Sequence, residues 1–243
     1  MDDVTPTWRC AARTDTGKVR ARNEDAVLAL PQHGLWAVAD GMGGHQNGAL
    51  ASRLVIEHLA DLPVKGTLAQ RLFELRQCLH RLNHRLGHEL TASADRPDTM
   101  IGSTVVALLV QYDRAACVWA GDSRCYLWRA RCLYQLSRDH SLVQRLIDER
   151  RLTPQQAAQH PDAHALTQAI GACTALKLDV LELDVLPGDV FLLCSDGLYQ
   201  AVPTHDIGVA LDTPCPKQAI ERLFQQGLGG PARDNLSAVV IRR

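Results

Sequence analysis

Acidic residues recur in this sequence where short apolar runs give way to sharp turns. The apolar run Leu35–Ala39 leads into Asp40-Gly41, and Val190–Cys194 leads into Ser195-Asp196-Gly197. Over the whole chain, the acids at such positions are Glu24 with Asp25, Asp40, Asp122, Asp196 and Asp234. One Asp-Gly pair is an ordinary turn signal, but five acidic positions at strand ends indicate side chains placed to meet. Because strand ends hold side chains more rigidly than long loops do, the pattern favours a β-rich fold in which these acids converge.

Convergent carboxylates need a partner of opposite charge. In a buried place they repel one another, and their burial is costly unless a cation neutralises them. A hard divalent ion such as Mg²⁺ or Mn²⁺ prefers oxygen ligands, and no Cys or His pattern in the sequence competes for it. A glycine after the acid, as at Gly41, also lets the backbone carbonyl approach an ion. The sequence therefore predicts a metal-dependent hydrolase.

Composition and charge exclude several other classes. The chain has 243 residues, is 46% hydrophobic and 22% charged, and carries a net charge of −1. This balance is typical of a globular protein and argues against nucleic acid or an anionic membrane as a partner. No apolar run is long enough to span a bilayer, and Met1-Asp2-Asp3 does not begin a secretory signal. The eight cysteines form no Cys-x-x-Cys pair, so we expect reduced thiols and a cytoplasmic location. We also expect a monomer.

Strands and helices are expected in blocks. Runs of strand length lie at 8–12, 26–30, 35–40, 103–110, 115–120, 124–128, 132–136, 178–185, 190–195 and 236–241. Apolar residues at helical spacing predict helices before Pro63, over 67–90, 141–151 and 154–160, and over 217–226. The four runs between 103 and 136, separated by turn signals, suggest an antiparallel meander. Because the blocks do not alternate regularly, we predict one α+β domain with antiparallel sheets and packed helices.

The order of the motifs resembles that of the metal-dependent, type 2C serine/threonine protein phosphatases, particularly their small bacterial members. The matching motifs are Gly17-Lys18-Val19-Arg20, Asn23-Glu24-Asp25, Asp40-Gly41-Met42-Gly43-Gly44-His45, Gly102-Ser103-Thr104, Gly121-Asp122-Ser123-Arg124, Asp139-His140-Ser141-Leu142, Ser195-Asp196-Gly197-Leu198 and Asp234-Asn235. The resemblance implies an α-β-β-α sandwich, in which two stacked antiparallel β-sheets are flanked by helical layers. It also implies a single phosphatase domain over 1–243 with a small helical flap roughly over 137–170.

The same resemblance implies roles for individual residues. Two Mn²⁺ or Mg²⁺ ions would be held by Asp40, the Gly41 carbonyl, Asp196 and Asp234, with Glu24 and Asp25 acting through water and Asp122 holding a weaker third ion. Arg20 would bind the substrate phosphate, for which its planar fork is suited. A water activated by two divalent ions can attack phosphorus in line, without a covalent enzyme intermediate. We expect phosphorylated Ser/Thr proteins as substrates and an opposing protein kinase as a partner.

One departure from the motif concerns the proton donor. Many eukaryotic relatives carry His directly after the Asp-Gly pair, where this chain has Met42. His45 is a nearby substitute, and water is the simpler donor. Two further functions stay open at this point: a catalytically silent phosphoprotein-binding module of the same fold, and a hydrolase of small phosphoesters.

Overall fold

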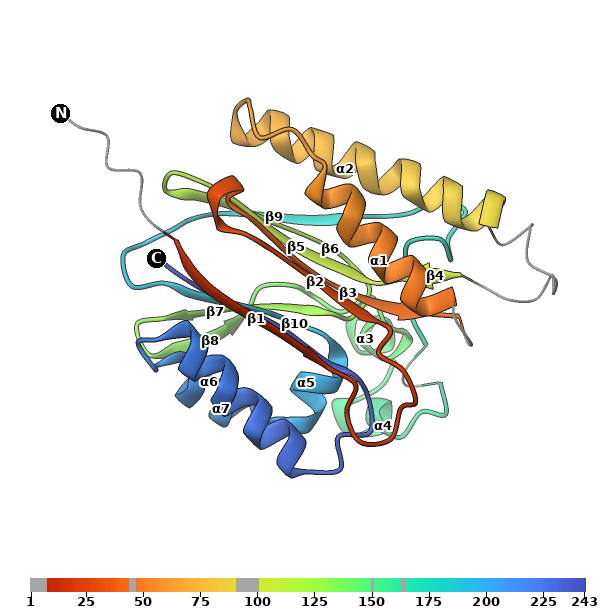
Figure 1. The fold of residues 1–243 in the computed structure, drawn as a ribbon. Coiled ribbons are helices and arrows are strands. Elements are labelled where there is room, and N and C mark those ends of the chain that lie inside the picture. Colours follow the sequence, from red (N-terminus) through yellow and green to blue (C-terminus); the bar gives the residue numbers. More distant parts are fainter. Residues whose placement is uncertain (1–7, 44–46, 91–100, 150, 163–164) are drawn as a thin grey trace.

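Two antiparallel β-sheets lie face to face in the computed structural model, which describes residues 8–43, 47–90, 101–149, 151–162 and 165–243 (Figure 1). The first sheet has the strand order β1 (Arg9–Asp15), β11 (Leu236–Arg242), β10 (Val190–Cys194), β7 (Arg124–Arg129) and β8 (Cys132–Gln135). The second has the order β2 (Asp25–Leu30), β3 (Leu35–Met42), β5 (Val105–Gln111), β6 (Arg114–Ala120) and β9 (Asp179–Asp184), and β4 (Gly102–Ser103) pairs with β3.

Helices cover the outer face of each sheet. The second sheet is covered by α1 (Asn47–Ala60) and α2 (Leu68–His84), and a π-helical turn, Arg85–Leu90, extends α2 (Figure 1). The first sheet is covered by α5 (Asp196–Ala201), α6 (Thr204–Leu211) and α7 (Pro216–Gly229). This arrangement confirms the predicted α+β class and its α-β-β-α layering.

Three apolar layers hold the sandwich together. Leu79 of α2 belongs to the layer under α1 and α2, Trp36 and Phe191 to the layer between the sheets, and Phe224 to the layer under the C-terminal helices. Each of these side chains is fully buried. Because both faces of a sheet are covered, a central strand such as β5 is apolar on both sides rather than alternating.

Helix α2 begins where its capping residues predict and buries the leucine stripe that predicts it. Thr67 caps α2 by accepting the Gln70 N–H, and the Gln70 side chain accepts the Thr67 N–H in return. The leucine stripe that includes Leu75 and Leu82 is buried against the sheet. The prediction of a helix over 67–90 is confirmed, with a change of helical type at Arg85.

The predicted meander over 103–136 is wrong. The strands β5 and β6 pair in the second sheet, whereas β7 and β8 pair in the first. Between them Gly121 has φ +110°, and a Cβ there would lie 2.6 Å from Cβ of Thr104, so the chain turns sharply from one sheet into the other. Turn signals and apolar runs predict neighbouring strands but do not distinguish a hairpin from such a crossing.

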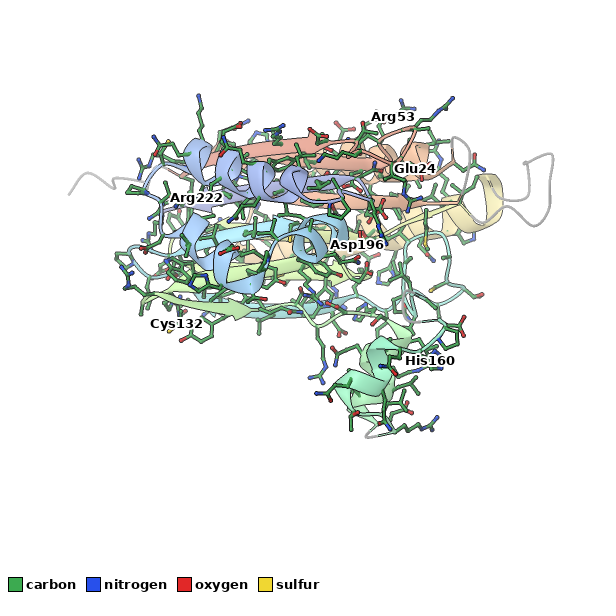
Figure 2. All side chains as sticks on the ribbon, turned by 90° about the horizontal axis from the view of Figure 1, so that it is seen from below. Glu24, Arg53, Cys132, His160, Asp196 and Arg222 are labelled. Atoms are coloured by element: carbon green, nitrogen blue, oxygen red, sulfur yellow. The ribbon has the colours of Figure 1, made fainter. Side chains whose placement is uncertain are left out.

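Two short helices, α3 (Leu142–Asp148) and α4 (Pro154–Ala158), lie within the predicted flap region. Figure 2 shows this part, which carries His160, projecting away from the two sheets. The sequence did not predict α5 and α6, because Asp196-Gly197 reads as a turn and both helices are short. None of the helices in the described ranges combines the length and apolar character that crossing a bilayer requires.

Candidate metal centre

The second sheet brings two of the predicted acids together directly. In the β2–β3 pair, Asp25 lies opposite Asp40, and the Gly41 N–H donates to the Glu24 carbonyl oxygen at 3.1 Å. Strand β3 thus continues through Asp40 to Met42 rather than ending before the acid. A Cβ on Gly41 would collide with the carbonyl oxygen of Gly48, so glycine is what allows α1 to begin against this strand.

The first sheet supplies two more acids at the same end of the sandwich. Asp196 opens α5 directly after β10, and Asp234 precedes β11, the strand beside β10. Asp122 lies in the crossing between the sheets, beside Gly121. Asp122, Asp196 and Asp234 therefore lie just outside the ends of central strands, as the sequence pattern predicts.

One cavity of about 710 Å³ gathers these groups. Of the predicted site residues, its lining includes Arg20, Glu24, Asp40, Gly41, Asp122, Asp196 and Asp234. Asp25 does not line it and lies behind, 9% exposed, whereas His45 is outside the described residues. The lining also contains Met42, Thr104 and Gln200, which we did not predict as site residues; Gln200 donates to Asp196 Oδ2 at 2.9 Å.

Burial and mutual repulsion raise the pKa values of three of the clustered acids. The pKa of Asp40 lies well above its ordinary value, first because the carboxyl is buried and then because Asp25, Asp196, Asp122 and Asp234 surround it. Burial, aided by repulsion from neighbouring acids, raises the pKa of Asp25 to about 6 and that of Asp122 to about 7. The protein alone thus disfavours the charged forms, and a bound cation would reverse this.

Buried hydroxyl groups fix the acids from behind. Ser195, which is fully buried, donates to Asp25 Oδ2 at 2.7 Å and accepts the Ser237 N–H at 3.0 Å. Thr104 Oγ1 accepts the Asp40 N–H at 3.0 Å and lies 2.8 Å from Ser123 Oγ. Because Ser195 belongs to the first sheet and Asp25 to the second, its hydrogen bond joins the two sheets at the site.

A half-buried arginine supports the Asp122 side of the cavity. Arg124 forms a two-pronged ion pair with Asp139, at 2.9 and 2.7 Å, and its guanidinium lies 3.7 Å from the centre of the Tyr199 ring. His140, which follows Asp139, donates its backbone N–H to the Gly121 carbonyl oxygen. Its ring Nδ1 accepts the Gly121 N–H. The motifs around Asp122 and Asp139 therefore meet in space, and this contact orders the turn that carries Asp122.

Asn235 ties the segment that carries Arg20 to the rest of the site. Its Oδ1 accepts the Glu24 N–H at 2.8 Å, and its Nδ2 donates to the carbonyl oxygens of Thr16 and Arg22, both at 2.9 Å. The side chain is 5% exposed, so water does not replace these partners if they are lost.

We expect Asn235→Ala to lower the free energy of unfolding of the metal-free protein by about 2–3 kcal/mol, because three hydrogen bonds are removed from a buried position. Urea unfolding measures this. The comparison is Asn23→Ala, which removes two less buried bonds, from Asn23 Nδ2 to Thr14 Oγ1 and from the Asp25 N–H to Asn23 Oδ1, and is expected to cost about 1 kcal/mol. Equal losses in the two variants would contradict the role given to Asn235.

Oxygen atoms dominate the donor set of the cavity, which suits Mg²⁺ or Mn²⁺. Within the described residues, no three His, Cys, Asp or Glu side chains form a group that could hold an ion by themselves. Instead, Asp234 Oδ2 accepts from Arg20 at 2.7 Å, and Asp196 accepts from Gln200. An ion that binds Asp196 and Asp234 would therefore replace these protein donors and complete its coordination with backbone carbonyl and water oxygen atoms. The raised pKa values of the buried acids are what such a site produces without its cation.

Comparison with known proteins agrees with this fold and identifies the family. The family model described as protein phosphatase 2C matches residues 17–236, and the chain belongs to that family. The resemblance drawn from the motifs, and with it the class of serine/threonine protein phosphatases, is thereby confirmed.

Individual relatives are similar over the whole chain. The serine/threonine protein phosphatase PstP of Mycobacterium tuberculosis is 37% identical over 240 residues, covering 99% of this chain but 46% of PstP, so the chain spans about half of that relative. The solved catalytic domain of PstP in complex with two manganese ions has a TM-score of 0.82 at 37% identity, with 97% of each chain covered. PppA, described as a key regulatory component of T6SS in Pseudomonas aeruginosa, has a TM-score of 0.88 at 38% identity, with 98% of each chain covered.

Proposed function

We propose that this chain hydrolyses phosphoserine and phosphothreonine in proteins with the help of Mn²⁺ or Mg²⁺. The observation that carries the proposal is the single cavity in which acids from both sheets meet, in a chain of the protein phosphatase 2C family. The oxygen donors and the raised pKa values favour a hard divalent cation over any other partner.

The proposed ligands follow from the lining of the cavity. Asp40 would bind both ions. The Gly41 carbonyl would bind the first ion, and Asp196 and Asp234 would bind the second. Glu24 and Asp25 would act through water, and Asp122 with Asp196 would hold a third ion. Ions held by these residues would supply a water of lowered pKa and positive charge to offset that of the phosphoryl oxygens.

The side chains of the protein position these ligands and the substrate. Ser195 and Thr104 fix Asp25 and the Asp40 backbone through the hydrogen bonds described above. Met42 lines the cavity but has no proton to give, so the proton for the leaving alkoxide comes from water. His45 stays a prediction as an alternative donor, since it lies outside the described residues.

Arg20 is proposed to bind the phosphate group at the mouth of the cavity. Its side chain is 55% exposed, and Nη2 bonds to Asp234 Oδ2, which raises the pKa of Arg20 further. One guanidinium nitrogen is thus engaged, while the fork retains donors for phosphate oxygens.

For Arg20→Ala we expect KM for a phosphothreonine peptide to rise about tenfold and kcat to fall less than about threefold, because one charge-assisted contact is lost while the ions remain. Steady-state kinetics at saturating Mn²⁺ separates the two constants. Arg20→Lys keeps the charge without the fork and should lie between wild type and alanine. An unchanged KM in Arg20→Ala would contradict the phosphate role.

The function itself is tested by phosphate release from a phosphothreonine peptide. The purified chain should act only with Mn²⁺ or Mg²⁺, should stop on addition of EDTA, and should act more slowly on free nucleotides. A chain that binds the peptide without turnover would support the silent binding module instead, and faster release from nucleotides would support the small-phosphoester hydrolase.

The setting of this activity is also proposed. The substrates would be cytoplasmic proteins phosphorylated by an opposing protein kinase. Residues 1–243 would act as one monomeric domain, with 137–170 as a flap beside the cavity. Ala165 and Leu166, which line the cavity from that region, support the flap assignment. The eight cysteines are free thiols, in keeping with a reducing compartment.

A further inference from the structure

A second cavity, of about 560 Å³, lies at the opposite end of β3 from the acids; we call it the distal cavity. Its walls include Trp8, His33, Val64, Arg71, Gln111 and Tyr112. Gly34, which also lines it, immediately precedes β3, and Asp40 lies six residues further along the strand. At about 3.3 Å per residue, the two cavities are roughly 20 Å apart and share no lining residue.

Arg71 is the unusual member of this cavity. It is only 8% exposed, and its side chain donates through Nη2 to the His33 carbonyl oxygen. Its Nε is buried without a hydrogen-bond partner. In the part of the chain that the structure describes, Arg71 forms no ion pair with a carboxylate, and burial alone lowers its pKa.

A buried guanidinium without an anion is costly, so it calls for an explanation. Anchoring the turn at His33 explains one of its five N–H donors. Arg242, the other described arginine with a buried unpaired Nε, differs because its Nη2 donates to two carbonyl oxygens, those of Leu211 and Thr213. The pairing of Arg71 is therefore poorer than that of the arginine most comparable to it.

The remaining walls suit a small flat ligand with one charged end. Trp8 and Tyr112 supply aromatic side chains, and Val64 adds apolar surface. Tyr112 is 63% exposed and is held at φ +55°, a conformation that costs energy for a residue with a large side chain. The volume falls in the range of cavities that enclose small organic molecules.

We propose that the distal cavity binds a small organic anion, whose carboxylate or phosphate-type group pairs with the Arg71 guanidinium and whose planar apolar body packs against Trp8 and Tyr112. The planar fork of the guanidinium matches the oxygen atoms of either group. This binding is separate from phosphate-ester hydrolysis and does not depend on the proposed function.

The test follows backbone amide and indole NMR signals of the Mg²⁺-loaded chain during titration with benzoate and with phenylphosphonate. Benzamide, which has the same shape as benzoate but no charge, is the neutral control. The two anions distinguish a carboxylate from a phosphate-type ligand. We expect saturable shifts at Gly34, Gln111, Tyr112 and the Trp8 indole with at least one anion, and no saturation with benzamide.

Variants on one helix sharpen the result. Arg71→Met removes the charge while keeping an apolar stem, and should weaken anion binding about tenfold or more, since a charge-assisted hydrogen bond is lost. Arg76→Met changes an exposed arginine of the same helix and should leave the affinity unchanged. The proposal is overturned if neither anion gives saturable shifts at the distal cavity. It is also overturned if benzamide binds there as tightly as the anions, or if Arg71→Met binds the anions as tightly as the wild type does. Should Arg71→Met fail to fold, the titrations of the wild type with benzoate, phenylphosphonate and benzamide decide alone.

Discussion

Replacing Asp40 by asparagine is expected to abolish turnover and, in the metal-free protein, to increase stability. Asp40 lies at the centre of the acids, where burial and four neighbouring carboxyl groups raise its pKa. Loss of a shared metal ligand should lower kcat/KM at least about 10³-fold, because an ion contributes several kcal/mol to the stabilisation of transition-state charge. Removal of a buried charge that its neighbours repel should raise the free energy of unfolding at pH 8 by about 1–3 kcal/mol.

Two measurements check the predicted loss of turnover and gain of stability: phosphopeptide kinetics at saturating Mn²⁺, and urea unfolding in EDTA. The matched control is Asp113→Asn, which changes an exposed aspartate in the turn between β5 and β6 and should alter neither quantity. Asp40→Asn with wild-type turnover would contradict its place as a ligand. A destabilised metal-free Asp40→Asn would contradict the repulsion between the acids.

The metal-free protein should lose stability as the pH rises from about 4 to 7, and added metal should restore it. Burial raises the pKa of Asp25 to about 6 and that of Asp122 to about 7 in the folded chain, whereas an unfolded Asp titrates near 3.8. Between these values the folded state binds more protons than the unfolded state, so the free energy of unfolding falls with rising pH. The upper limit is about 3 kcal/mol for Asp25 and about 4 kcal/mol for Asp122, and the loss is complete above the folded pKa.

Thermal unfolding in EDTA and in Mg²⁺ across pH 5 to 8 measures this effect. The stabilisation by Mg²⁺ should increase with pH, because protons compete with the ion for the same oxygen atoms. Asp122→Asn should flatten the slope observed in EDTA, whereas Asp113→Asn should leave it unchanged. A metal-free chain whose stability rises between pH 5 and 7 would show that the clustered acids are not the dominant titrating groups.

The sequence predicts the meeting of the acids because each one stands beside an apolar run that can only be a buried strand. The pairing of β2 with β3, which sets Asp25 opposite Asp40, is known only from the structure. The roles of Ser195 and Asn235 could not be read in advance, since serine and asparagine next to an aspartate are ordinary turn residues. A residue that holds a site side chain in place differs from an ordinary turn residue in being buried and in bonding to a partner distant in sequence, as Ser195 does to Asp25.

The assignment of strands to sheets is the other part that sequence patterns do not determine. The pattern around Gly121 looks the same for a hairpin and for a crossing between sheets, because both need a sharp turn. Only the packing of β6 beside β9 and of β7 beside β10 decides between them. Asp122 lies at this crossing, so its position depends on the least predictable connection of the fold.

The position of β11 has a consequence for how the protein matures. This strand, the last in the described chain, inserts between β1, the first, and β10, and Asp234 directly precedes it. During translation, the residues up to Arg242 must therefore be synthesised before the first sheet can form in full. A chain that stops short of residue 234 therefore lacks both the strand that joins β1 to β10 and a carboxylate of the cavity, so the first sheet and the acidic site are completed together.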